Sequence, residues 1–78
     1  MNAFDQIAEN YLTEKLDWIR DCAVSDARNG RNRSGGFVHT LDALKFNYSH
    51  IRQLPKHVIE DARREYDVAY SQATCLAR

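Results

Sequence analysis

The last third of the chain carries the pattern that most constrains the fold. Apolar and small residues recur there at steps of three and four positions: Ile59, Ala62, Tyr66, Ala69, Ala73 and Leu76. Because an α-helix turns about 100° per residue, this spacing places all six side chains on one face. The pattern predicts an amphipathic helix over about 55–76, opened by Pro55, whose alanines let another helix approach closely.

The chain before Gly30 contains neither glycine nor proline and predicts a second long helix, over about 3–28. Asn2 is a suitable N-cap, and Asp5 suits the positive end of the helix dipole. One apolar stripe is expected to face the core: Ala8, Leu12, Leu16, Ile19 and Ala23. A second apolar band lies beside it: Phe4, Ile7, Tyr11, Trp18 and Cys22. Together the two bands cover about half of the helix circumference, more than the rest of a small domain readily shelters.

The middle of the chain predicts a loop followed by a shorter helix. Gly30 is a good helix stop, and the stretch RNGRNRSGG indicates a flexible connector of about nine residues. A helix over about 40–53 follows, begun by His39 or Thr40. Its apolar seam comprises Leu41, Leu44, Tyr48 and Ile51. A short strand over 36–39 is the alternative for the start of this segment.

These segments predict an all-α fold. The 78 residues form a single domain, 1–78, and its helices are long, short and long. Short connections favour antiparallel neighbours, so we expect a small three-helix bundle with a flexible basic loop between the first two helices. In this up-down-up arrangement the first and third helices run parallel. Cys22 and Cys75 then lie towards the same end, and we expect both to be thiols in a reducing cytoplasm.

Charge is balanced overall but unevenly distributed. Eleven basic and eleven acidic residues cancel, which argues against general binding of nucleic-acid phosphates. The first third is acidic, whereas the loop concentrates basic charge on Arg28, Arg31 and Arg33. Three interpretations of this loop stay open: a solvated connector, a contact for a protein partner, or a contact for nucleic acid.

The sequence offers no recognisable catalytic or cofactor chemistry. The three histidines, His39, His50 and His57, do not share the helical spacing of a metal-binding pair, and the two cysteines match no zinc motif. Phosphate-binding glycine motifs and serine nucleophile motifs are also missing. We therefore expect no enzyme, no metal and no cofactor. The N-terminus resembles no signal peptide and no apolar run could span a bilayer, so we expect a cytoplasmic protein without a membrane partner.

The long first helix carries the residues most suggestive of function. Tyr11 and Trp18 are seven positions apart and share a face, which is either core or an exposed interface. The acidic residues beside them are Glu9, Glu14, Asp17 and Asp21, which either solubilise the helix or engage a basic surface on a partner.

The leading hypothesis is a small non-enzymatic protein-binding module, an adaptor or inhibitor that occludes a surface of a larger protein or complex. Its predicted partner-binding residues are Tyr11, Trp18, Arg28, Arg31 and Arg33. By analogy of size and composition, such chains resemble the inhibitors of host machinery, including anti-defence proteins, that phages and mobile elements carry. The alternative is a nucleic-acid-binding accessory protein that uses the basic loop at 28–33. A third hypothesis is a homodimer whose long helices pair.

Overall fold

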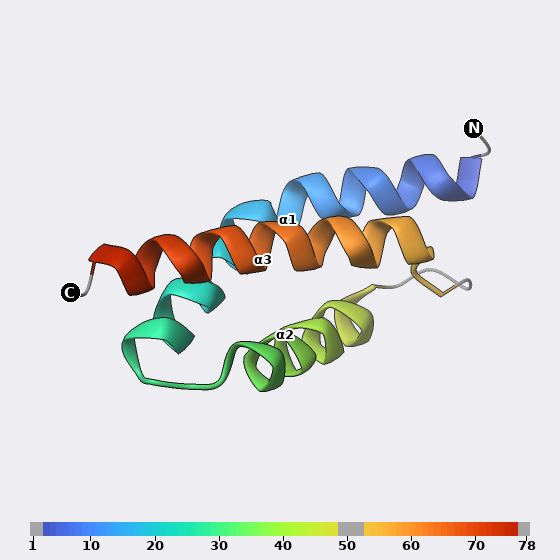
Figure 1. Ribbon diagram of the computed structural model, residues 1–78. Coiled ribbons are helices and arrows are strands. Elements are labelled where there is room, and N and C mark those ends of the chain that lie inside the picture. Colours follow the sequence, from blue (N-terminus) through green and yellow to red (C-terminus); the bar gives the residue numbers. More distant parts are fainter. Residues whose placement is uncertain (1–2, 49–52, 77–78) are drawn as a thin grey trace.

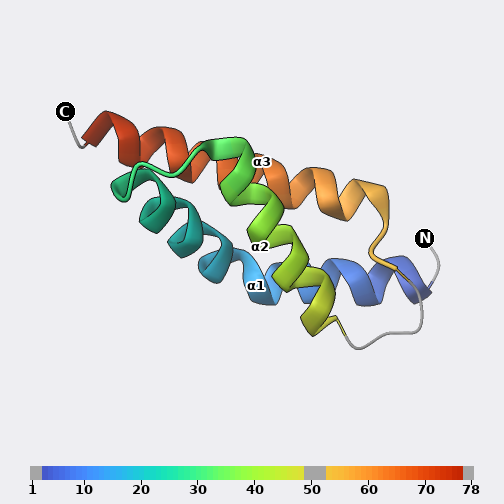
Figure 2. The same cartoon turned by 90° about the horizontal axis from the view of Figure 1, so that it is seen from below.

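The computed structural model describes residues 3–48 and 53–76, and these residues form three helices. Helix α1 spans Ala3–Arg28, α2 spans Arg33–Asn47 and α3 spans Lys56–Leu76. Helices α1 and α3 run parallel and side by side, and α2 returns antiparallel to both (Figure 1). Viewed from below, α2 crosses the face that the two long helices form (Figure 2). The all-α bundle predicted from the sequence is thereby confirmed.

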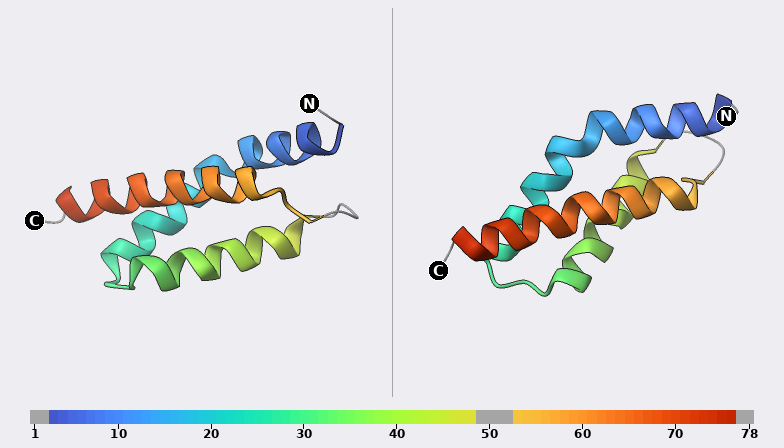
Figure 3. Two further views of the ribbon diagram at one scale, coloured as in Figure 1. Left: turned by 45° about the vertical axis from the view of Figure 1, so that its right-hand side comes forward. Right: turned by 45° about the horizontal axis from the view of Figure 1, so that its top comes forward.

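The core lies mainly between α1 and α3. The predicted faces of both helices supply most of it, and the buried residues of these two helices are Ala8, Leu12, Ile19, Ala23, Val58, Ala62, Tyr66, Ala69 and Ala73. Phe37, Thr40 and Leu44 of α2, together with Leu54, are buried as well. Leu16 and Ile59 are partly buried against this cluster. Alanines on both helices let α1 and α3 approach each other closely. The molecule is elongated and measures 44 × 19 × 17 Å (Figure 3).

Helix α2 begins seven residues earlier than the sequence pattern suggested, at Arg33 rather than Thr40. The reason is a cap at Asn32, whose Oδ1 accepts hydrogen bonds from the backbone N–H groups of Ser34 (2.9 Å) and Gly35 (3.2 Å). The connector therefore comprises only residues 29–32, not nine residues, and Gly30 supplies its one positive φ among the described residues, 71°. The strand considered for 36–39 is wrong, because these residues are helical.

The end of α2 also differs from the prediction. The helix stops at Asn47, and Tyr48 caps it by donating its backbone N–H to the carbonyl of Lys45. Gln53, the predicted last residue of the helix, is not helical. Residues 49–52, which include Ile51 of the predicted seam, lie outside the described residues, as does the predicted cap Asn2.

Pro55 marks the start of α3 as the sequence indicated. Its carbonyl accepts hydrogen bonds from the N–H groups of Val58 (3.1 Å) and Ile59 (3.2 Å), and the helix proper begins at Lys56. Among the described residues, none of the three helices combines the length and the apolar character that crossing a bilayer requires.

Candidate functional site

An open groove runs between α1 and the C-terminal half of α2. Its largest hollow, about 470 Å³, is lined by Ile7, Asn10, Tyr11, Glu14, Lys15, Asn47 and Tyr48. A second hollow of about 180 Å³ shares Tyr11, Lys15 and Asn47 and extends to Trp18 and Leu44. The groove arises because α2 is a short helix that covers only part of the apolar circumference of α1.

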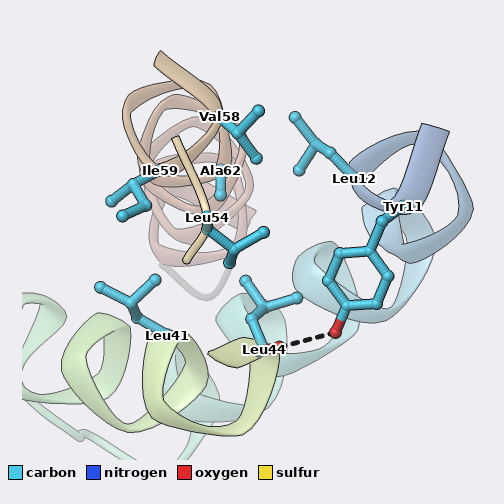
Figure 4. A pocket seen from close by; sticks show the side chains of 8 residues that line it. All are labelled: Tyr11, Leu12, Leu41, Leu44, Leu54, Val58, Ile59 and Ala62. Atoms are coloured by element: carbon cyan, nitrogen blue, oxygen red, sulfur yellow. Dashed lines mark hydrogen bonds between the residues drawn. The ribbon is translucent and has the colours of Figure 1, made fainter. Parts of the chain in front are cut away.

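Tyr11 lines both hollows of this groove and joins the two helices. Its hydroxyl donates a hydrogen bond of 2.7 Å to the Leu44 carbonyl (Figure 4). Its ring lies 4.9 Å from the ring of Tyr48. Lys15 places its Nζ 5.8 Å from the Tyr11 ring centroid, a cation–π contact. Burial, followed by the neighbouring Tyr48, raises the pKa of the Tyr11 phenol above its ordinary value. Tyr11 is thus half-buried, and its hydrogen bond holds α1 against α2.

Trp18 has a different environment from Tyr11, although the two share one face of α1. Trp18 is 37% exposed and Ile7 is 42% exposed. The sequence left open whether this band belongs to the core or to an interface. In the structure it is divided, since Tyr11 packs inward while Trp18 and Ile7 reach the surface.

Phe46 is an exposed aromatic that the sequence analysis did not single out. It is 89% exposed and directly precedes Asn47, which lines the groove. A signal was present, because Phe46 falls off the seam formed by Leu41, Leu44 and Tyr48. An apolar ring outside the core-facing seam of a helix is a candidate for contact with another molecule.

The predicted basic residues lie at the C-terminal end of α1 and in the connector that follows it. Arg28, the last residue of α1, is about 15 Å from Trp18 along the helix axis. Arg31 Nε lies 3.7 Å from Asp26 Oδ1, and Arg33 Nε lies 3.8 Å from Asp67 Oδ1. Arg28 is exposed and has no ion-pair partner within residues 3–48 and 53–76. Of the five predicted partner-binding residues, Tyr11 and Trp18 line the groove, whereas none of the three arginines does.

Two tyrosine hydroxyls of α3 form hydrogen bonds with the last turn of α1 and with the connector. The hydroxyl of Tyr66, a fully buried residue, donates a 2.5 Å hydrogen bond to Asp26 Oδ2, and Tyr70 donates one of 2.7 Å to the Arg31 carbonyl. Burial, and then the hydrogen bond to Asp26, strongly raise the pKa of the Tyr66 phenol. A methyl group at Gly36 would overlap the Tyr66 hydroxyl, so glycine is required where α2 passes this contact.

The described residues contain no group of three or more His, Cys, Asp or Glu side chains arranged to hold a metal ion. Cys22 is half-buried and Cys75 is exposed, and both are free thiols. The chain matches no protein-family model, no curated protein and no solved structure.

Proposed function

We propose that this chain is a small non-enzymatic protein-binding module, an adaptor or inhibitor that occludes part of the surface of a larger protein. The observation that carries the proposal is the groove between α1 and α2, with the Trp18 indole and Ile7 exposed beside it. Tryptophan at the edge of a groove is typical of residues that dominate binding energy, since it buries a large rigid surface on contact.

The groove also suits a protein better than a small substrate. Its walls combine apolar and aromatic side chains with polar and charged ones, and it is open along its length rather than enclosed. Two antiparallel helices with an open groove between them can accept a further helix, as in bundles and helix-in-groove complexes. We propose that the partner contributes such an element.

The nucleic-acid alternative has less support. Arg31 and Arg33 lie in ion pairs with Asp26 and Asp67, so a phosphate would have to compete with these carboxylates. Arg28 alone among the three loop arginines is uncommitted within the part of the chain that the structure describes. One exposed arginine supplies little of the electrostatic attraction that phosphate binding requires.

The narrower idea, an inhibitor of host machinery carried by a phage or mobile element, rests on size and composition. We expect such a module to act in the cytoplasm, where a reducing environment keeps an exposed thiol such as Cys75 free. We propose that an inhibitor of this size acts by covering a surface of its partner.

Affinity capture from the native cell extract, with and without nuclease, tests the proposal. We expect Trp18→Ala to remain folded, since over a third of the side chain is exposed, and to weaken partner binding by about thirtyfold or more. Val68→Ala is the matched control, because Val68 is a 51% exposed apolar residue on α3. The proposal is supported by a partner that is still captured after nuclease treatment, that binds the Val68→Ala control, and that no longer binds the Trp18→Ala variant.

Two outcomes contradict it. Loss of every captured partner on nuclease treatment would favour nucleic-acid binding instead. Unfolding of the free Trp18→Ala variant, measured by circular dichroism, would show that the indole belongs to the core.

A further inference from the structure

The charges of this protein are compensated unevenly between its two long helices. Every acidic residue of α3 lies within 4.0 Å of a basic group: Glu60 with Lys56, Asp61 with Arg64, Glu65 with Arg20, and Asp67 with Arg33 and Arg63. On α1, Glu9 lies 3.6 Å from His57 and Asp26 pairs with Arg31. Of the remaining acidic residues on the two long helices, Glu14, Asp17 and Asp21 lie on α1 and are exposed.

Three exposed carboxylates, those of Glu14, Asp17 and Asp21, form an acidic column on α1. Glu14 and Asp21 have no ion-pair partner within residues 3–48 and 53–76. Asp17 contacts Arg20 at 3.2 Å, but Arg20 also contacts Glu65 at 3.1 Å, so two carboxylates share this one cation. Successive members of the column are about 4.5 and 6 Å apart along the helix axis.

The acidic column borders the groove on the side of Trp18. At about 100° per residue, all three carboxylates fall within about 100° of Trp18 and to the same side of it. Glu14 also lines the larger hollow. The cation of the groove lining, Lys15, has its Nζ beside the Tyr11 ring. A molecule that covers Trp18 must therefore lie alongside exposed carboxylates.

We infer that the groove receives an amphipathic helix of a partner protein whose polar face is basic, with its apolar side chains against Trp18 and Ile7 and its Lys or Arg side chains along the acidic column. This inference rests on the proposed function and names the chemistry of the partner. Carboxylates beside exposed apolar side chains such as Trp18 and Ile7 select a basic partner through favourable Coulomb energy and repulsion of acidic competitors.

Other occupants fit less well. Nucleic acid would bring phosphates against the acidic column. In a second copy of this chain, the basic residues Arg31 and Arg33 around the connector are paired with Asp26 and Asp67, and Arg63 and Arg64 on α3 are paired with Asp67 and Asp61. Pairing of two α1 helices would bring one acidic column towards the other.

Two synthetic helical peptides test the inference. They share one leucine pattern and contain no tryptophan, and their polar faces carry lysine in one and glutamate in the other. Trp18 is the single tryptophan of the chain, so its fluorescence reports binding at the groove directly. We expect the lysine peptide to shift this fluorescence to shorter wavelength, with affinity that falls as salt is added, and the glutamate peptide to have no effect.

Two charge-matched triple variants complete the design. Glu14→Gln, Asp17→Asn and Asp21→Asn together should weaken binding of the lysine peptide about tenfold. The control combines Glu60→Gln, Asp61→Asn and Glu65→Gln, which change the net charge equally on α3 and should weaken binding less than about twofold. Each triple variant also removes one of the two carboxylates that contact Arg20: Asp17 in the first variant and Glu65 in the control. The loss of an Arg20 ion pair is therefore the same in both variants.

Three results overturn the inference: no response to the lysine peptide, equal binding of the two peptides, or equal effects of the two triple variants. The last would indicate attraction by bulk charge alone. These failures differ from failure of the proposed function, which is judged by Trp18-dependent capture. If a nuclease-resistant partner requires Trp18 but not the acidic column, the proposed protein-binding function is supported. The inference that the partner presents a basic helix is then wrong.

Discussion

Replacing Tyr66 by phenylalanine removes one oxygen atom from the interior of the bundle and tests how the end of α1 is held against α3. Tyr66 is fully buried, and its hydroxyl is the closest polar contact of Asp26, at 2.5 Å. Without it, Asp26 keeps Arg31 at 3.7 Å, which is longer than a hydrogen bond. The Asp26 side chain is 17% exposed, so water compensates only part of the loss.

The expected cost follows from the charge on the acceptor. A hydrogen bond to a charged group contributes about 1.5–3 kcal/mol, and we expect Tyr66→Phe to lower the free energy of unfolding by about 2 kcal/mol. The whole domain has roughly 4–12 kcal/mol of stability at this length. For a domain of this size the change corresponds to a fall in Tm of about 8–16 °C.

Urea and thermal unfolding, followed by far-ultraviolet circular dichroism, measure this change. Tyr70→Phe is the matched control, because Tyr70 lies one turn later on α3 and donates to a neutral acceptor, the Arg31 carbonyl, at 2.7 Å. That exposed hydrogen bond should contribute only about 0.5–1 kcal/mol. Equal effects of the two substitutions, or a cost below about 0.5 kcal/mol for Tyr66→Phe, would refute the assignment of Asp26 as a charged anchor for α3.

Two further predictions concern the same contact. Gly36→Ala places a methyl group against the Tyr66 hydroxyl and the Asp26 carboxylate and should cost about 1–3 kcal/mol in urea unfolding. Gly35→Ala meets nothing within 4 Å and should instead stabilise the helix by up to about 1 kcal/mol, so a similar loss in both variants would contradict the packing argument. Stability should also fall at alkaline pH, because folding raises the pKa of Tyr66 and, less strongly, of Tyr11. Below about pH 10 both phenols are protonated in the folded and unfolded chains, and above it the unfolded chain loses protons first. The urea midpoint of the native protein should decline above about pH 10 more steeply than that of Tyr66→Phe, and parallel curves would contradict this.

The faces of the long helices could be predicted from the sequence because helical periodicity is a local property. Ala8, Leu12, Ile19 and Ala23 on α1 are buried as their spacing indicated. On α3 the same holds for the periodic positions Ala62, Tyr66, Ala69 and Ala73. The side chain of Leu76, the last position of that pattern, lies outside the described residues.

The start of α2 was harder to predict because two local signals compete. Gly35 and Gly36 disfavour a helix, whereas Asn32 caps one. The position of Gly36 against Tyr66 and Asp26 explains why glycine occurs inside this helix. That reason is invisible in sequence, since it depends on residues 10 and 30 positions away along the chain.

The candidate site also combines features that local sequence predicts with features that depend on contacts between helices. Trp18 was identified from its position on α1, but its exposure depends on how far α2 covers that helix. The isolation of the basic loop from Trp18 follows from helix geometry, whereas the ion pair between Arg33 and Asp67 joins residues 34 positions apart. The exposure of Phe46 could be predicted from the periodicity of α2 alone, once the core-facing side of that helix was known.

The sequence by itself determined the three helices and the core-facing sides of the two long ones, because backbone propensity and apolar spacing act within a few residues. Only the tertiary structure decided which part of the apolar band on α1 is exposed and which charges are neutralised. Burial and ion pairing depend on distances between separate helices, and these distances are set by how closely small residues such as Ala62 and Gly36 let the helices pack.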